Sequence, residues 1–246
     1  MYGDEAWMKE EKRMGFLKDA AAVFKKKKLV FKERRQIGGD VYTFRFEKPE
    51  ELSWRAGQHG LFTITHKKVK PPTKPFTISS SPREDVIEMT TRIDDRPSDY
   101  KQALLELEPG MEMTMSGPVG SFHTDDGERM VFIAGGIGIT PFHAMLRELS
   151  DADIRAETPP ILLYVDGEGR FTYSEELSVI TDRGIAEVHF IESSEELHKE
   201  LELLEGTDVE NYLIAGPYSM VESVSKHLVG TGVPKKNIRK ETFIGY

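Results

Sequence analysis

The chain has 246 residues, and its 33 basic and 42 acidic side chains give a formal net charge of −9, which argues against broad nucleic-acid binding. It contains no cysteine, so disulfides, thiolate zinc sites and cysteine-ligated iron–sulfur clusters are excluded within it. No apolar run approaches the roughly 18 residues that span a bilayer, and the N-terminus lacks an apolar signal core. We therefore expect a cytoplasmic protein without a transmembrane segment, whose own redox centre, if it has one, is organic.

The N-terminal region is helical and basic in pattern. Residues 4–24 place Trp7, Met14 and Phe24 at helical spacing, which predicts an amphipathic helix. It would either pack on its own domain or serve as a docking segment. The following lysines, beginning with Lys25–Lys28, make the first third of the chain basic. This surface would suit an acidic redox partner, and an ordinary solvated face is the alternative.

Residues 28–116 have the pattern of a small antiparallel barrel. Short apolar segments are separated by Gly, Pro, Asp and charged residues, and Gly38-Gly39 marks a hairpin. Many short strands at close spacing indicate a small barrel. The six predicted strands are Lys28–Ile37, Asp40–Phe46, Leu61–Thr65, Phe76–Ser79, Val86–Ile93 and Glu112–Ser116, with a helix over Asp99–Leu107.

After residue 127 strands alternate with helices, which predicts a parallel sheet with helices on both faces. We therefore expect an N-terminal extension over 1–27, a barrel domain over 28–126 and an α/β domain over 127–246, with the boundary near Thr124–Gly127. The predicted strands are Arg129–Ala134, Pro160–Asp166, Ala186–Ile191 and Asn211–Ala215, and the helices are Pro141–Leu149, Ser174–Thr181, Ser194–Leu204 and Ser219–Val229.

A glycine turn joins the first strand of the α/β domain to its helix. Gly135, Gly136 and Gly138 lie between the apolar strand and Thr140-Pro141, which opens the helix. Such a turn presents backbone N–H groups, and the helix dipole favours a phosphate there. A glycine cluster alone is a weak signal, but the position at the first strand–helix junction strengthens it.

Three other segments carry polar chemistry. Lys74-Pro75-Phe76-Thr77 combines a cation, a ring and a hydroxyl on one predicted strand, where alternation places Thr77 on the opposite face from Lys74 and Phe76. Ser116–Phe122 has the glycines and proline of a tight turn. Ala215-Gly216-Pro217 ends the last predicted strand, and the carboxyl ends of parallel strands meet at one edge, beside the glycine turn.

In this order the motifs resemble the ferredoxin–NADP reductase superfamily over residues 28–246. The resemblance implies an FAD-binding barrel, an NAD(P)H-binding α/β domain, and hydride transfer from NAD(P)H to the flavin. Electrons would then pass to a separate acceptor such as ferredoxin, flavodoxin or an oxygenase component. The alternatives are a flavin reductase that releases reduced flavin, and a non-catalytic binding module in a complex.

The resemblance also implies roles for particular residues. Lys74 would hold the flavin phosphates, Phe76 would lie against the ring, and Thr77 would reach its N5 atom. Lys and Phe replace the Arg and Tyr of the family motif Arg-x-Tyr-Ser/Thr, so flavin affinity is expected to be weaker. The remaining implied contacts are Pro75, Thr90, Thr91, Arg92, Gly117, Gly120 and Ser121 on the flavin side, and Gly135, Gly136, Gly138, Thr140, Gly216 and Pro217 on the nicotinamide side.

The same resemblance assigns the hydride site, the tail and the nucleotide. Ala215 stands where relatives have a cysteine near the transferred hydride. Glu241 would supply a proton, and Phe243 or Tyr246 would cover the flavin, although Tyr246 fits a plain tail equally well. Asp166 follows the second strand of the α/β domain, and an acid there suits the 2′-hydroxyl of NADH. Arg170 would reverse this preference by attracting a 2′-phosphate, so NADH is favoured over NADPH by Asp166 alone.

Overall fold

The computed structural model describes residues 25–124, 129–152, 158–207, 209 and 211–243. The helix expected over residues 4–24 and the tail residue Tyr246 lie outside these ranges. The centre of the expected domain boundary, residues 125–128, also lies outside them, so the three-part division stays a prediction. In the part of the chain that the structure describes, no helix is long and apolar enough to cross a membrane.

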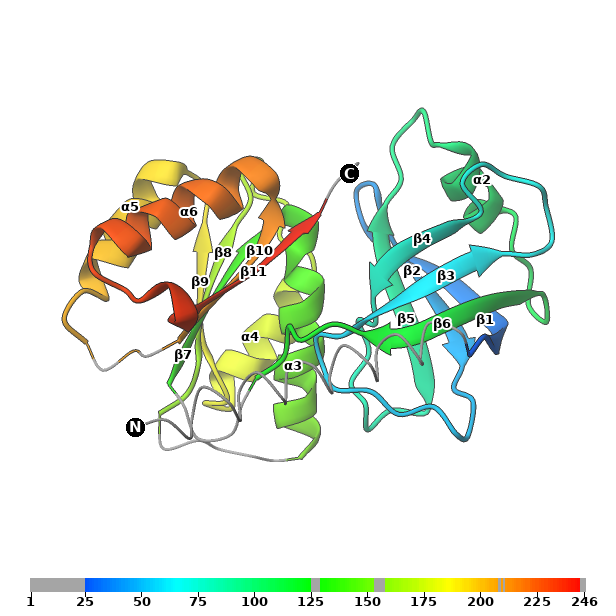
Figure 1. The fold of residues 1–246 in the computed structure, drawn as a ribbon, viewed down its shortest axis with the longest axis horizontal. Helices are drawn as coiled ribbons and strands as arrows, with labels where there is room; N and C mark the ends of the chain where they lie inside the picture. Colours follow the sequence, from blue (N-terminus) through cyan, green and yellow to red (C-terminus); the bar gives the residue numbers. More distant parts are fainter. Residues whose placement is uncertain (1–24, 125–128, 153–157, 208, 210, 244–246) are drawn as a thin grey trace, which may run out of the picture.

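The first half of the chain forms an antiparallel sheet of six strands in the order β4-β3-β6-β1-β2-β5, as predicted. The strand order leaves β4 and β5 at the edges, and these edges meet where the Ser79 N–H donates to the Glu88 carbonyl oxygen (2.9 Å). The curled sheet therefore has the form expected of the barrel (Figure 1). Its elements are β1 (Lys27–Gly38), β2 (Val41–Glu47), β3 (His59–Ile64), β4 (Thr73–Thr77), β5 (Val86–Arg92), α2 (Asp99–Leu105) and β6 (Glu112–Val119).

The interior of this curled sheet is aromatic. Strand alternation sends Phe44 and Phe46 of β2 inward, where they meet Phe31 of the adjacent β1 and Phe62 of the more distant β3. Phe31 and Phe46 pack edge to face at 5.6 Å between ring centroids. Tyr100 of α2 closes one end, and its hydroxyl donates to the Phe62 carbonyl oxygen (3.0 Å). The polar end of this buried ring is thus satisfied, so helix α2 is fixed on the sheet.

The second half forms a parallel sheet in the order β11-β10-β7-β8-β9. The helices α3 and α4 pack on one face, and α5 and α6 pack on the other, as predicted (Figure 1). The central strand β7 is buried along its whole length, which explains its unbroken apolar sequence. The elements are β7 (Met130–Gly135), η1 (Gly136–Ile139), α3 (Thr140–Asp151), β8 (Ile161–Val165), α4 (Ser174–Asp182), β9 (Glu187–Ile191), α5 (Ser194–Leu203), β10 (Asn211–Pro217), α6 (Tyr218–Gly230), η2 (Lys235–Asn237) and β11 (Ile238–Phe243).

Buried polar contacts join the two sheets. His143 of α3 is fully buried, and its Nδ1 atom lies 3.1 Å from the Ser79 carbonyl oxygen of the first half. The His143 ring stacks on Tyr173 with 3.6 Å between centroids, and the Tyr173 hydroxyl donates to Thr90 Oγ1 of β5 (2.7 Å). Burial raises the pKa of Tyr173 well above that of an exposed tyrosine, so this hydroxyl stays a donor. The two sheets are therefore held in one arrangement by hydrogen bonds as well as by packing.

Candidate functional site

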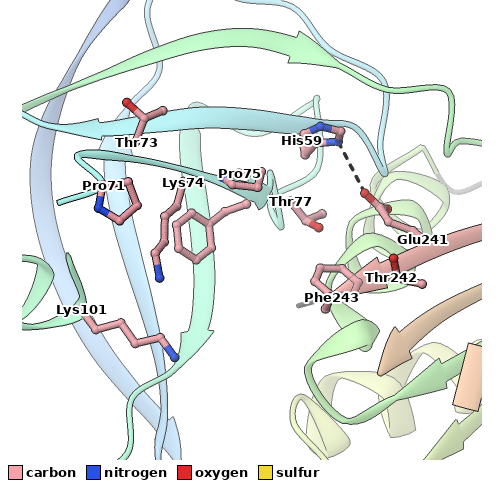
Figure 2. A pocket seen from close by; sticks show the side chains of 11 residues that line it. His59, Pro71, Thr73, Lys74, Pro75, Thr77, Lys101, Glu241, Thr242 and Phe243 are labelled. Atoms are coloured by element: carbon pink, nitrogen blue, oxygen red, sulfur yellow. Dashed lines mark ion pairs between the residues drawn. The ribbon is translucent and has the colours of Figure 1, made fainter. Parts of the chain in front are cut away.

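A cavity of about 450 Å³ lies where the first sheet faces the carboxyl end of β11 (Figure 2). Its volume is in the usual range for sites that bind small organic ligands. The first half contributes one wall from β3, β4 and α2, and the second half contributes the end of β11. The lining residues are His59, Pro71, Thr73, Lys74, Pro75, Phe76, Thr77, Lys101, Glu241, Thr242 and Phe243.

Two buried oxygen atoms in this cavity have no hydrogen-bond partner in the described part of the chain. They are Thr77 Oγ1, at the end of β4, and Glu241 Oε2, on β11. An unsatisfied buried polar atom costs about 1–3 kcal/mol. Figure 2 shows the two side chains approaching the cavity from opposite sheets. This pair fits a ligand whose edge carries hydrogen-bonding groups, as a flavin ring does, so the residues predicted to contact flavin N5 and to supply a proton are brought together.

Two lysines line another part of the same cavity. The Lys74 ammonium lies 5.6 Å from the centroid of the Tyr100 ring, a cation–π contact. Lys101 is 8% exposed, and burial, followed by the neighbouring charge of Lys74, lowers its pKa. An anion between the two ammonium groups would relieve this repulsion, so the pair fits a phosphate or pyrophosphate. Lys74 was predicted for this role and Lys101 was not.

A sequence signal for Lys101 does exist. Ser98 caps helix α2, and its side chain accepts from the Lys101 N–H, so Lys101 lies in the first turn of the helix. A cation in this position opposes the helix dipole. Lys101 lines the cavity beside Lys74 in spite of this unfavourable position.

Phe76 is a core residue rather than an open ring face. It is 3% exposed, it stacks on Tyr100 at 5.7 Å between centroids, and it packs edge to face with Phe62. The alternation argument placed Lys74 and Phe76 on one face, and both do line the cavity, but the Phe76 ring is enclosed by its neighbours. The ring that β11 brings to the cavity is Phe243, which was predicted to cover the flavin.

His59 is another lining residue that sequence reasoning missed. It begins β3, directly across the ladder from Thr77 of β4, and its Nδ1 atom lies 3.5 Å from Glu241 Oε1. The dashed line in Figure 2 marks this pair. A lone histidine at a strand end carries no pattern that points to a site. Only the sheet register and the approach of β11 place it there.

The end of β6 and the residues that follow it shape the cavity wall instead of lining it. Gly120 has φ +103°, and a Cβ atom there would lie 3.0 Å from the His59 ring. Gly117 is also at positive φ, and a Cβ atom there would lie 3.2 Å from the Val119 backbone nitrogen. Ser121 is exposed. The structure therefore explains these glycines by the close approach of neighbouring groups, whereas a pyrophosphate was the expected reason.

The glycine turn of the second sheet forms as predicted, between β7 and α3. A side chain at Gly135 would meet the Met220 sulfur at 2.5 Å, and one at Gly138 would meet the Gly216 Cα at 2.7 Å. Gly136 differs because its φ is +51° and a Cβ there would find no atom closer than 3.6 Å. Gly136 thus leaves room beside the backbone, as a phosphate loop requires. The Thr140 hydroxyl is buried and donates to the Ile137 carbonyl oxygen (3.2 Å) instead of facing a ligand.

The loop after β10 lies beside this turn, as the sheet argument predicted. Gly216 has φ +154°, and a Cβ there would lie 3.0 Å from the Gly135 Cα. Pro217 is exposed at the start of α6. Ala215, expected near the transferred hydride, is fully buried in β10 with its carbonyl oxygen against Gly138. It does not line the cavity, so in this structure it supports the glycine turn.

Arg92 and Asp166 pair with each other across the two sheets. Arg92 Nη2 lies 2.8 Å from Asp166 Oδ2, and Asp166 Oδ1 accepts the Glu168 N–H at 3.0 Å. Both oxygens of Asp166 are therefore engaged, whereas this residue was expected to face a ribose and Arg92 to face the flavin nucleotide. A Cβ at Gly136 would lie 3.6 Å from Arg92 Nη2, so the ion pair sits over the glycine turn.

Thr90 and Thr91 are structural in this arrangement. Thr90 Oγ1 is shared by the hydroxyls of Thr43 (2.8 Å), Ser79 (3.1 Å) and Tyr173 (2.7 Å). Thr91 is fully buried. Neither residue lines the cavity: the Thr90 hydroxyl belongs to the network that joins the sheets, and the Thr91 hydroxyl lies 3.4 Å from the Arg92 carbonyl oxygen.

The comparisons with known proteins agree with this geometry. Residues 24–135 match the family model described as an FAD-binding domain. The chain is 30% identical over 109 residues to one component of the Na(+)-translocating NADH-quinone reductase of Neisseria meningitidis, covering 40% of this chain and 27% of that protein. It is 26% identical over 113 residues to the flavodoxin/ferredoxin–NADP reductase of Rhodobacter capsulatus, covering 44% of this chain and 41% of that protein.

The whole fold matches solved structures. The H286L mutant of ferredoxin–NADP+ reductase from Plasmodium falciparum superposes with a TM-score of 0.75 at 17% identity, covering 90% of this chain and 97% of that one. The matched segments span less than half the length of either curated relative named above. These findings confirm the expected fold, and the match of residues 24–135 to an FAD-binding domain model supports the expected resemblance.

Proposed function

We propose that this chain, a ferredoxin–NADP reductase-like protein by its fold and its FAD-binding-domain match, is an NAD(P)H-dependent flavoprotein reductase. It would transfer a hydride from NAD(P)H to FAD and pass the electrons to a separate acceptor such as ferredoxin, flavodoxin or an oxygenase component. The observation that carries the proposal is the cavity in which Thr77 Oγ1 and Glu241 Oε2 lack partners in the described chain.

In this proposal, different side chains of the cavity contact the phosphates and the ring of FAD. FAD, when bound, supplies the hydride acceptor and allows electrons to leave one at a time. Lys74 and Lys101 would hold its phosphates, and Thr77 would donate to or accept from the edge of the ring. Glu241 would hold a proton beside that edge, and Phe243 would limit the access of water.

NAD(P)H would bind at the carboxyl end of the second sheet. The backbone at Gly136 and the start of α3 offer N–H groups to its pyrophosphate. Asp166 supports NADH only when its carboxylate leaves Arg92, since a free acid there would accept from the ribose 2′-hydroxyl and repel a 2′-phosphate. NADH is therefore the proposed donor. Arg170 is the group that would instead favour NADPH, by attracting its 2′-phosphate.

The acceptor is proposed to be an acidic redox protein that approaches the basic first half. Part of this charge is already neutralised, because Lys67 pairs with Glu106 at 2.6 Å and Lys28 pairs with Glu112. The docking surface would thus be the remaining lysines around the cavity mouth, including Lys68 and Lys70, which are exposed. The proposal keeps the division into 1–27, 28–126 and 127–246.

The absorbance spectrum of the purified protein tests this function directly. We expect flavin bands that bleach under anaerobic conditions on addition of NADH, and more slowly with NADPH. Faster bleaching with NADPH would reverse the assignment of the donor. A protein that stays colourless after FAD and FMN are added, and that oxidises neither nucleotide, would contradict the flavoprotein assignment.

A second candidate is a reductase that treats flavin as a released substrate. Its support is the enclosure of Phe76, since the family motif places an aromatic ring against the flavin and this ring is packed in the core. Gel filtration separates the two candidates. Flavin that elutes with the protein supports a bound cofactor, and flavin that is lost while NADH oxidation then depends on added FMN or FAD supports the release of reduced flavin.

A further inference from the structure

We propose that His59 is a positioning residue that fixes the carboxylate of Glu241, so that one oxygen rests against the imidazole and the other is presented to the ligand beside Thr77. This inference rests on the proposed function for its meaning, because the ligand edge would be that of the flavin. Nothing in the family match or in the predicted motif set pointed to this histidine.

The first sheet fixes the imidazole. His59 pairs with Thr77 of β4 on one side and with Val119 of β6 on the other, so its backbone is held by both neighbouring strands. A Cβ at Gly120 would lie 3.0 Å from His59 Nδ1 and 3.1 Å from Cε1, which means that the ring packs directly over this glycine. Gly120 therefore packs against the His59 imidazole and limits its rotation away from the cavity.

The second sheet brings the carboxylate to this ring. Glu241 lies on β11 in register with Ala215 of β10, and its side chain is 20% exposed. Oε1 is 3.5 Å from His59 Nδ1, whereas the buried Oε2 has no partner among the described residues. His59 thus contacts one oxygen and leaves the other for a donor that the described residues do not provide.

Partial burial strengthens the interaction between His59 and Glu241. The His59 side chain is 28% exposed, so the interaction is less screened than one on an open surface. A glutamate without such a partner samples several rotamers, and ordering it costs side-chain conformational entropy. By holding the carboxylate in advance, His59 would remove that cost from ligand binding and from the chemical step.

The cross-strand relation to Thr77 explains why this position is suited to the role. Directly opposite residues in an antiparallel ladder have their side chains on the same face of the sheet. His59 and Thr77 therefore reach the same side of the cavity, and Glu241 meets them from β11. The three groups form one polar corner, and in it Thr77 and Glu241 each have a buried oxygen without a partner among the described residues.

The test uses nuclear magnetic resonance of the flavin-free full chain, labelled on glutamate, with Glu241→Gln to assign the signal. In the wild type we expect two distinct Hγ shifts for Glu241, as in a fixed side chain. In His59→Leu they should merge toward an averaged value, and in His59→Asn, which keeps a donor at the place of Nδ1, they should separate again. His66→Leu, in the exposed loop after β3, is the matched control and should change nothing.

The second readout is the rate at which NADH reduces protein-bound flavin. His59→Leu should lower this rate roughly tenfold with a melting temperature close to that of the wild type, and it should cause no further loss in a Glu241→Gln background. Unchanged Glu241 shifts in His59→Leu, failure of His59→Asn to restore them in a folded protein, or additive losses in the double variant would each overturn the proposal. A wild type that binds no flavin defeats the proposed function, while the Glu241 shifts still decide the positioning role.

Discussion

At the scale of single residues, Thr77 is a buried threonine that differs from Thr43 in how its hydroxyl is satisfied. It is 4% exposed and its hydroxyl lacks a partner in the described chain, whereas the Thr43 hydroxyl, similarly buried, meets Thr90 Oγ1 at 2.8 Å. Both threonines bury a hydroxyl group, but only the Thr43 hydroxyl has a hydrogen-bond partner among the described residues. Thr77 therefore costs stability in the absence of a ligand, and Thr43 contributes to it.

Replacing each threonine by valine separates these roles. We expect Thr77→Val to raise the free energy of unfolding of the flavin-free protein by about 0.5–1 kcal/mol, because an unsatisfied hydroxyl is removed without a change in shape. Thr43→Val should lower it by about 1 kcal/mol. Urea denaturation measures both, and fluorescence titration with FAD should show weaker binding for Thr77→Val. A destabilised Thr77→Val protein would mean that this hydroxyl is already satisfied.

At the scale of elements, the glycines of the turn between β7 and α3 have different roles, some in packing and one in leaving space for a ligand. Gly138 lies against the carbonyl of Ala215, and a Cβ there would be 2.7 Å from the Gly216 Cα. Both neighbours are backbone atoms at the ends of parallel strands, so they cannot rotate away. Gly138 is thus a packing requirement, whereas Gly136 is the member of the motif with open space.

Gly138→Ala is therefore expected to destabilise the fold by about 1–3 kcal/mol, through overpacking of the strand ends. Gly230 provides the matched control, because it ends α6 at ordinary φ and a Cβ there would meet nothing within 4 Å. Gly230→Ala should be neutral or slightly stabilising. Thermal unfolding of the two variants checks the contrast, and equal melting temperatures would contradict the assignment of Gly138 to packing.

Most of the elements could be predicted from the sequence, since period and turn residues act locally, although the strand predicted at Phe76–Ser79 is observed at Thr73–Thr77 and β11 was not predicted. The predicted strand Val86–Ile93 is observed as Val86–Arg92, and the predicted helix Ser194–Leu204 as Ser194–Leu203. The site was only half predictable. Lys74, Thr77 and Glu241 carry motif signals, but His59 enters the cavity through cross-strand register. The pairing of Arg92 with Asp166 depends on how the sheets meet, and no local pattern encodes that.

At the scale of the whole molecule, the contact between the sheets contains buried ionisable groups. His143 is fully buried between the Ser79 carbonyl oxygen (3.1 Å) and the Glu176 carboxylate (2.9 Å). Arg147, one turn further along α3, pairs with Glu84 and reaches Glu88 at 3.4 Å. The pKa values of Glu84 and Glu176 are shifted in opposite directions. Burial raises the pKa of Glu84, whereas the hydrogen bond with His143 lowers the pKa of Glu176.

The contribution of Glu176 to the stability of the contact between the sheets therefore depends on pH. Because its folded-state pKa lies below the reference value of 4.5, its contribution to stability is present above that pH and is lost as the pH falls through the lowered value. Glu176→Gln should reduce the melting temperature by about 1–3 °C at neutral pH, a small effect because half of the side chain faces solvent. The difference from the wild type should shrink well below pH 4.5. Glu175→Gln alters the neighbouring acid in the first turn of α4, which lacks this partner, so it should melt like the wild type throughout. Scanning calorimetry across this range decides the matter: a Glu176→Gln deficit that persists unchanged in acid would mean that Glu176 acts through packing and not through its charge.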